Sequence, residues 1–225
     1  VEAKPMSFLK IDRAETLLPE GTDIYSKKVY ETARHTLDKM IWDGSFIQDE
    51  TDCYYVYALT MRGRTQTGLV GCASIDDYLN GVILRHENTL ETKEQDRIRH
   101  IDACSAQTGP IFLTHRPDED LRHILNRISH GPALYDFTSE DGIRHQVWKI
   151  QSAEDIADIS RLCGQMNHLY IADGHHRAAS AVKVGLARKS ADPNSSSMEE
   201  YNFFLSVLFP SDELKIYGYD RIVTD

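Results

Sequence analysis

The sequence predicts an α+β protein in which mixed or antiparallel sheets are flanked by helices. Residues 53–75 and 134–150 have the aromatic and β-branched composition of two hairpins. Apolar residues recur at helical spacing in residues 118–128 and 153–166. Because strand and helix patterns are mixed along the chain and several strands form hairpins, α+β is favoured over a doubly wound sheet.

The first third of the chain is predicted to form a strand, a helix and a hairpin. The helix is predicted to end at Asp43-Gly44, and the hairpin to turn at Arg62-Gly63-Arg64. The predicted elements are a strand at 7–11, a helix at 26–42, strands at 53–61 and 65–75, and a short helix at 76–80.

The remaining elements alternate between short apolar runs and amphipathic stretches. Glu140-Asp141-Gly142 is a turn signal between two strands, and the polar residues 189–199 are predicted to form an exposed loop. Helices are predicted at 92–106, 118–128 and 153–166, and strands at 82–84, 111–114, 134–138, 143–150, 169–172 and 202–209.

Chain length bounds the domain organisation. A chain of 225 residues is long enough for one α+β domain over 1–225. A subdivision into a hairpin-rich part, 1–150, and a second part, 151–225, is an alternative. The chain starts at Val1 and ends at Asp225 without a terminal pattern, so we expect a fragment of a longer protein.

Composition makes several classes of partner and of protein unfavourable. Lys and Arg number 25 against 35 Asp and Glu, a net charge of −10, so nucleic acid and anionic membranes are unfavourable partners. The four cysteines contain no CxxC pair, which indicates reduced thiols in a cytoplasmic protein. No apolar run is long enough to cross a bilayer. Oligomerisation is left open.

The chain is organised around residues 168–179, His-Leu-Tyr-Ile-Ala-Asp-Gly-His-His-Arg-Ala-Ala. They are predicted to form a buried strand, a turn at Asp173-Gly174 and an Ala-rich helix. Asp173 is predicted to be the N-cap, and Gly185 to begin the end of the helix.

The start of this helix is predicted to bind an anion. Gly174 allows close approach of a ligand, and His175, His176 and Arg177 occupy the first turn. Free backbone N–H groups, the positive end of the helix dipole and a guanidinium would together suit a phosphate. Asp173 and His175 are candidate catalytic residues beside it.

A second polar cluster, Arg85-His86-Glu87-Asn88-Thr89, follows the short strand at 82–84. Glu87 is the candidate general base, and His86 could share a proton with it. Arg85 is a candidate phosphate ligand. Thr89, Asp96, Arg97 and Arg221 are predicted to have supporting roles.

Metal binding is a separate hypothesis. The cluster is not a His-Glu-x-x-His motif, because position 90 is Leu, and adjacent histidines on a helix diverge by about 100°. A site that combines His86, Glu87, Asp173 and His175 remains open. Mg²⁺ delivered with a nucleotide is favoured over zinc, with Asp173 or Glu87 as the nearest protein ligand.

Several motifs in this order resemble the uncharacterised family 1015 of domains of unknown function, which is often loosely labelled as related to the chromosome-partitioning protein ParB. The resemblance spans nearly the whole chain. The motifs are Lys-Pro-Met-Ser-Phe-Leu-Lys-Ile-Asp-Arg-Ala-Glu (4–15), Arg-His-Glu-Asn-Thr (85–89), Asp-Arg (96–97), Gly-Pro-Ile-Phe (109–112), Ile-Ala-Asp-Gly-His-His-Arg (171–177) and Tyr-Asp-Arg-Ile-Val (219–223).

The Asp-Gly-His-His-Arg turn is also similar to the phosphate-binding turn of the ParB/sulfiredoxin superfamily, whose members use CTP or ATP. This resemblance implies a strand–turn–helix phosphate site and a nucleotide (ADP, ATP or CTP) with Mg²⁺ as its ligand. No haem, flavin or zinc is expected.

Three functions are consistent with these residues. The first is a nucleotide-dependent phosphotransferase acting on a small hydroxyl compound, such as a free amino acid like serine. The second is a ParB-like nucleotide-binding module associated with DNA. The third is a metal-dependent hydrolase that uses the His and carboxylate clusters.

Overall fold

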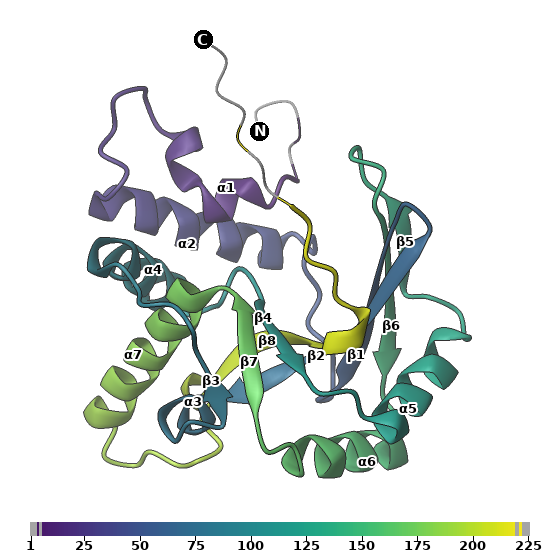
Figure 1. Cartoon of the computed structure of the whole chain (residues 1–225). Helices are drawn as coiled ribbons and strands as arrows, with labels where there is room; N and C mark the ends of the chain where they lie inside the picture. Colours follow the sequence, from purple (N-terminus) through teal and green to yellow (C-terminus); the bar gives the residue numbers. More distant parts are fainter. Residues whose placement is uncertain (1–3, 5, 219–220, 222–225) are drawn as a thin grey trace.

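A computed structural model describes residues 4, 6–218 and 221, and the structural statements below concern these residues (Figure 1). The helices are α1 (Leu9–Asp12), α2 (Lys27–Trp42), α3 (Ile75–Leu79), α4 (Glu91–Cys104), α5 (Glu119–Ser129), α6 (Ala153–Gly164) and α7 (His175–Ala191), with short 3₁₀ turns at Ala14–Leu17, Glu200–Asn202 and Ser211–Glu213. The strands are β1 (Tyr54–Met61), β2 (Arg64–Ser74), β3 (Ile83–Leu84), β4 (Ile111–His115), β5 (Tyr135–Thr138), β6 (Arg144–Ile150), β7 (Leu169–Asp173) and β8 (Phe203–Pro210).

The eight strands of the described region form one mixed sheet in the order β3-β7-β4-β8-β2-β1-β6-β5. The pairs β3–β7 and β4–β8 are parallel, and the other neighbours are antiparallel. With helices beside this sheet, the α+β class and the mixed sheet predicted from the sequence are confirmed.

The main core follows the register of the sheet. One row of residues paired across β6, β1, β2 and β8 is buried. Trp148 lies opposite Val56, Val56 opposite Leu69, and Leu69 opposite Leu208. Apolar side chains of α5, α6 and α7 belong to the same cluster. One row of paired positions thus becomes one continuous core, since paired residues lie on the same face of a sheet.

The helices on the left of Figure 1 are stacked. Helix α4 packs on α7 on one side and on α2 on the other, and α1 packs on α2. A second, smaller core, with Ala14, Val29, Ala33 and Cys104 at its centre, holds α2 and α4 together. No helix within the described residues is long and apolar enough to cross a membrane.

Two sequence predictions about these elements are wrong. Residues 7–11, predicted to be a strand, lead into the short helix α1, because local hydrogen bonds such as Ile11 N–H to Phe8 O close a turn there. Helix α7 does not begin to end at Gly185 but continues to Ala191, so the exposed loop starts later than residue 189.

Gly185 serves close packing within the helix. A Cβ atom at this position would lie 2.3 Å from the carbonyl oxygen of Tyr201 and 2.9 Å from Cδ1 of Ile75. The glycine therefore lets the segment after α7 return across the helix, which the sequence cannot distinguish from a termination signal.

We predict that Gly185→Ala lowers the free energy of unfolding by about 1–3 kcal/mol, since the overpacking outweighs the better helix propensity of alanine. Gly164→Ala is the matched control, because nothing lies within 4 Å of a Cβ there and the residue is also helical. Urea unfolding of the two variants measures the difference. Equal stability would contradict the packing argument.

Candidate functional site

The junction between β7 and α7 is a glycine in the left-handed region. Gly174 occupies the N-cap position with φ +95°, and no side chain caps the helix. The prediction that Asp173 caps α7 is therefore wrong. Asp173 is the last residue of β7, and its carboxylate instead accepts a hydrogen bond from Nη2 of Arg177 at 2.9 Å.

The guanidinium of Arg177 lies against this glycine. A Cβ atom at Gly174 would be 3.0 Å from Nη2 and 3.1 Å from Nε of Arg177. Glycine is thus required here twice, for the backbone conformation and for the space that the guanidinium occupies. Nε of Arg177 is buried and has no hydrogen-bond partner in the described region.

Strand pairing brings the second polar cluster to the same helix. Strands β3 and β7 are parallel neighbours, with Leu84 opposite Tyr170. The residues that follow the two strands therefore lie side by side at the carboxyl ends of these strands. The rings of His86 and His175 meet edge to face, with centroids 4.5 Å apart. Oε2 of Glu87 is 3.6 Å from Nδ1 of His175.

His175 is buried, and Glu87 is largely exposed. Burial, and next to it the neighbouring His86, lower the pKa of His175 below its ordinary value of 6.5, so the ring is neutral at neutral pH. Its Nε2 is buried and, among the described residues, has no hydrogen-bond partner.

The other members of the 85–89 segment are held by their own contacts. Arg85 donates a hydrogen bond to the hydroxyl of Tyr78 at 3.0 Å and lies over that ring. Thr89 donates to the carboxylate of Glu94, which also pairs with Lys183 of α7. Glu94 is buried, and its contacts with Thr89 and Lys183 tie the loop, α4 and α7 together.

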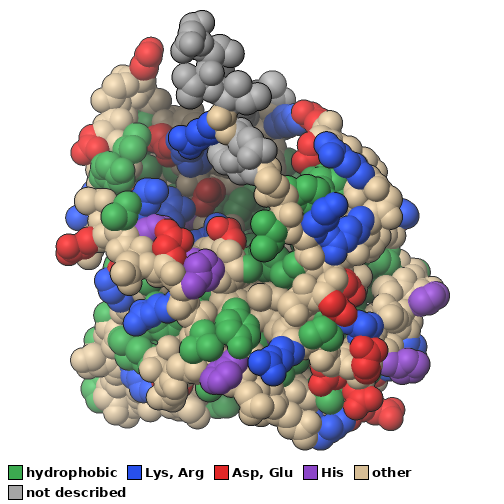
Figure 2. Space-filling model, viewed as in Figure 1, with side chains coloured by type: hydrophobic (Ala, Val, Ile, Leu, Met, Phe, Trp, Pro, Cys, Tyr) green, Lys and Arg blue, Asp and Glu red, His purple; other side chains and the backbone are tan. Residues whose placement is uncertain are grey.

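A cleft of about 500 Å³ opens on the other side of the start of α7. Figure 2 shows the surface hollowed on this face, with cationic side chains in blue at the edge of the hollow. We call it the α4–α7 cleft. Its lining comprises Asp12, Tyr25, Lys93, Asp96, Arg97, His100, Ile101, Gln107, Thr108, Gly109, Ile111, His176 and Arg177.

Of the residues singled out from the sequence, the lining contains His176, Arg177, Asp96 and Arg97. Arg85, His86, Glu87, Thr89, Asp173, Gly174 and His175 do not belong to it. The start of α7 thus has two sides. One side carries the His86–Glu87–His175 cluster, and the other faces the cleft.

Sequence reasoning missed part of the lining, although a signal was present. Lys93, Asp96, Arg97, His100 and Ile101 are spaced as one face of a helix, and this face of α4 lines the cleft. A mostly polar stripe at such spacing predicts a solvent-exposed face of a helix. Only the tertiary structure shows that this face lines a cleft.

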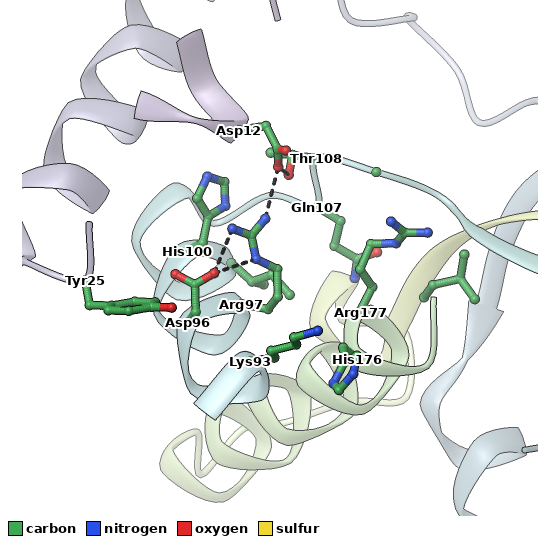
Figure 3. Close-up of a pocket in the computed structure, with 13 residues that line it drawn as sticks. Asp12, Tyr25, Lys93, Asp96, Arg97, His100, Gln107, Thr108, His176 and Arg177 are labelled. Carbon is green, nitrogen blue, oxygen red and sulfur yellow. Dashed lines mark hydrogen bonds and ion pairs between the residues drawn. The ribbon is translucent and has the colours of Figure 1, made fainter. Parts of the chain in front are cut away.

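The guanidinium of Arg97 is held by two carboxylates inside the cleft (Figure 3). Nε and Nη2 donate to Oδ2 of Asp96 at 3.0 and 2.8 Å, and Nη1 donates to Oδ1 of Asp12 at 3.0 Å. Burial alone would lower the pKa of Arg97, but the two carboxylates outweigh it and raise the pKa. Asp96 also accepts from the hydroxyl of Tyr30, whose pKa is raised to about 12, mainly by burial.

The other cations of the lining are Lys93, which has no ion pair within the described residues, and Arg177, whose Nη2 also pairs with Asp173. In Figure 3, Lys93 of α4 extends toward His176 and Arg177 of α7. Nδ1 of His176 is buried without a hydrogen-bond partner within the described part of the chain. Side chains of two helices thus converge with the first turn of α7 on one wall of the cleft.

Metal ligands do not gather at either side. The described residues contain no group of three or more His, Cys, Asp or Glu side chains that could hold a metal ion. Glu87 and Asp173 are each engaged by one neighbour, His175 and Arg177. Mg²⁺ would therefore depend on ligands brought by a bound molecule.

Arg221 is exposed, and Tyr219, Asp220, Ile222 and Val223 of its motif lie outside the described residues. Its predicted supporting role stays a prediction.

The fold and the cleft define the class: an α+β protein with a polar, cation-bearing cleft at the N-terminus of a long helix. A family model described as "Protein of unknown function (DUF1015)" matches residues 1–225, so the chain belongs to this family and that resemblance is confirmed. Comparison with curated proteins found no match, and neither did comparison with solved structures.

We predict that Glu94→Gln lowers the free energy of unfolding by about 1–2 kcal/mol at neutral pH, because a buried hydrogen-bonded charge loses its ion pair. Burial would raise the pKa of Glu94, but Lys183 and Thr89 outweigh it and lower the pKa below 4.5. The charged form thus stabilises the fold above the unfolded-state pKa, and this contribution is lost as the pH falls through the lowered folded-state value.

The stability difference between wild type and Glu94→Gln should therefore be largest above about pH 5 and shrink in acid. Urea unfolding at a series of pH values measures it. Glu91→Gln, an exposed residue of the same helix, is the control and should change little. A difference that grows on acidification would contradict the assignment.

Proposed function

We propose that this protein is a nucleotide-dependent phosphotransferase that acts on a small hydroxyl compound. The nucleotide phosphates bind in the α4–α7 cleft, against Lys93, His176 and Arg177. The terminal phosphoryl group is then transferred to the hydroxyl of the second substrate.

One observation carries the proposal: cationic side chains of two helices converge on the uncapped first turn of α7 in a cleft of about 500 Å³. Phosphoryl transfer depends mainly on positioning and on compensating the charge of the phosphate oxygens, which amides and cations do. Nδ1 of His176 and Nε of Arg177 are buried without a partner among the described residues. Nε always carries a proton to donate to an anion, and Nδ1 donates when the imidazole is protonated at that nitrogen.

Two further features of the protein favour a nucleotide as the ligand of the cleft. The Asp-Gly-His-His-Arg turn resembles the phosphate-binding turn of the ParB/sulfiredoxin superfamily, whose members use ATP or CTP. A cleft of about 500 Å³ also lies within the range of about 300–1,000 Å³ typical of small-molecule sites. Mg²⁺ would enter bound to the nucleotide phosphates, which supply ligands that the described side chains lack.

A thermal-shift screen with ADP, ATP, CTP and pyrophosphate, each with and without Mg²⁺, tests binding. At about a hundred times Kd, a ligand adds about 2.7 kcal/mol of stability. For a chain of this size the midpoint should rise by roughly 5–10 °C. If none of the four ligands shifts the midpoint, the cleft is not a nucleotide site.

We predict that Lys93→Ala and Arg177→Ala each weaken binding of the stabilising nucleotide about 10- to 100-fold, because each removes a charge-assisted contact with phosphate. Lys189→Ala is the matched control, since this residue is exposed, lies in the last turn of α7 and does not belong to the cleft lining. Isothermal titration calorimetry measures the four constants. A control that loses as much affinity would point to net charge and not to the cleft.

A further inference from the structure

The two ends of the α4–α7 cleft carry opposite charge. Lys93, His176 and Arg177 lie at one end, and Asp12 lies at the other, with Arg97 between them in Figure 3. Arg97 is shared by two carboxylates, Asp12 and Asp96, so this group of three side chains has one negative charge in excess.

The two carboxylates differ in the contacts that they make. Both oxygens of Asp96 accept hydrogen bonds, Oδ1 from Tyr30 and Oδ2 from Arg97. In Asp12 only Oδ1 is engaged, by Arg97 at 3.0 Å and by Thr108 at 3.1 Å. Oδ2 of Asp12 has no partner in the described part of the chain, and the side chain is 35% exposed.

The contacts of Asp12 also hold it rigidly at the cleft. It ends α1, and the neighbouring Ile11 accepts a hydrogen bond from Nε2 of the buried His100, a residue of α4, at 3.0 Å. The carboxylate is thus fixed from α1, α4 and the loop before β4. A fixed carboxylate with one free oxygen in a cleft is suited to accept a proton.

We infer that the Asp12 end of the cleft is the acceptor subsite and that Asp12 is the general base of the reaction. This rests on the proposed function. The subsite takes the hydroxyl end of a neutral or positively charged small molecule, because the excess negative charge repels a carboxylate or phosphate there.

In the proposed phosphoryl transfer, the hydroxyl oxygen of the acceptor forms a bond to the terminal phosphorus of the nucleotide. The bond from that phosphorus to the bridging oxygen breaks, and its electron pair leaves with the nucleoside diphosphate. The hydroxyl proton passes to Oδ2 of Asp12. Glu87, the base predicted from the sequence, lies outside the cleft lining, on the His175 side of α7.

The test compares Asp12→Asn, Glu91→Gln and Glu87→Gln in an assay of ADP release from Mg²⁺-ATP with ethanolamine as the acceptor. Glu91→Gln is the control, since it removes an exposed carboxylate of α4 that does not belong to the cleft lining. We expect Asp12→Asn to lower kcat about 100- to 10,000-fold while the KM for ATP stays within a few-fold. The other two variants should keep kcat within a few-fold of wild type.

Asp12→Glu guards against a folding defect, because it keeps the charge beside Arg97 but displaces the carboxylate. It should unfold at the wild-type temperature and still lose most of kcat. Normal turnover by Asp12→Asn, or an equal loss in Glu91→Gln, would overturn the assignment of Asp12. Faster ADP release with glycolate, which is anionic, than with ethanolamine would overturn the charge argument.

The outcomes separate the two proposals. If none of the four ligands of the thermal-shift screen binds to the wild-type protein, the proposed function fails. If ATP binds and ADP is released, but Asp12→Asn behaves as wild type, only the present inference fails.

Discussion

The geometry at the centre of this protein depends on one backbone conformation, the left-handed turn at Gly174. It joins β7 to α7 so sharply that the first turn of the helix lies directly beside the carboxyl end of β7. It also leaves the space in which the guanidinium of Arg177 rests, 3.0 Å from where a Cβ would stand. A larger residue would strain the backbone and displace the arginine, so the chain direction and the placement of the cation have the same cause.

Around this turn, the contacts of each cationic side chain indicate whether it is held by other side chains or faces the cleft. Three donors of Arg97 are directed at Asp12 and Asp96, and Arg85 is held by Tyr78. These contacts give both arginines a structural role, although their positive charges alone would suggest anion binding. Lys93 has no ion pair within the described residues, whereas Arg177 lines the cleft and also pairs with Asp173. The contacts of each cation, and not the number of cations, therefore indicate where a phosphate would be bound.

Local patterns predicted most helices and strands, because amphipathic spacing and hairpin composition act over a few residues. They failed at three places, and at only one of these did a distant segment decide the outcome. Gly185 was interpreted as the start of a helix end, but it accommodates the backbone of Tyr201. The 7–11 strand was predicted from composition alone and is instead a turn of helix. Asp173 has the chemistry of an N-cap, but it ends β7 one residue before the cap position, and its carboxylate accepts a hydrogen bond from Arg177.

The sequence by itself determined the α+β class, the membership of the family and the strand–turn–helix around Gly174. Each of these depends on motifs and patterns formed by residues that are close together in the sequence. Only the tertiary structure decided that the start of α7 has two sides. Parallel pairing of β3 with β7 brings His86 and Glu87 to His175. Packing of α4 between α2 and α7 brings Asp12, Lys93 and Arg177 to one cleft. These residues are separated by as many as 165 positions along the chain (177 − 12), and only the long-range packing of helices and strands brings them within reach of one ligand.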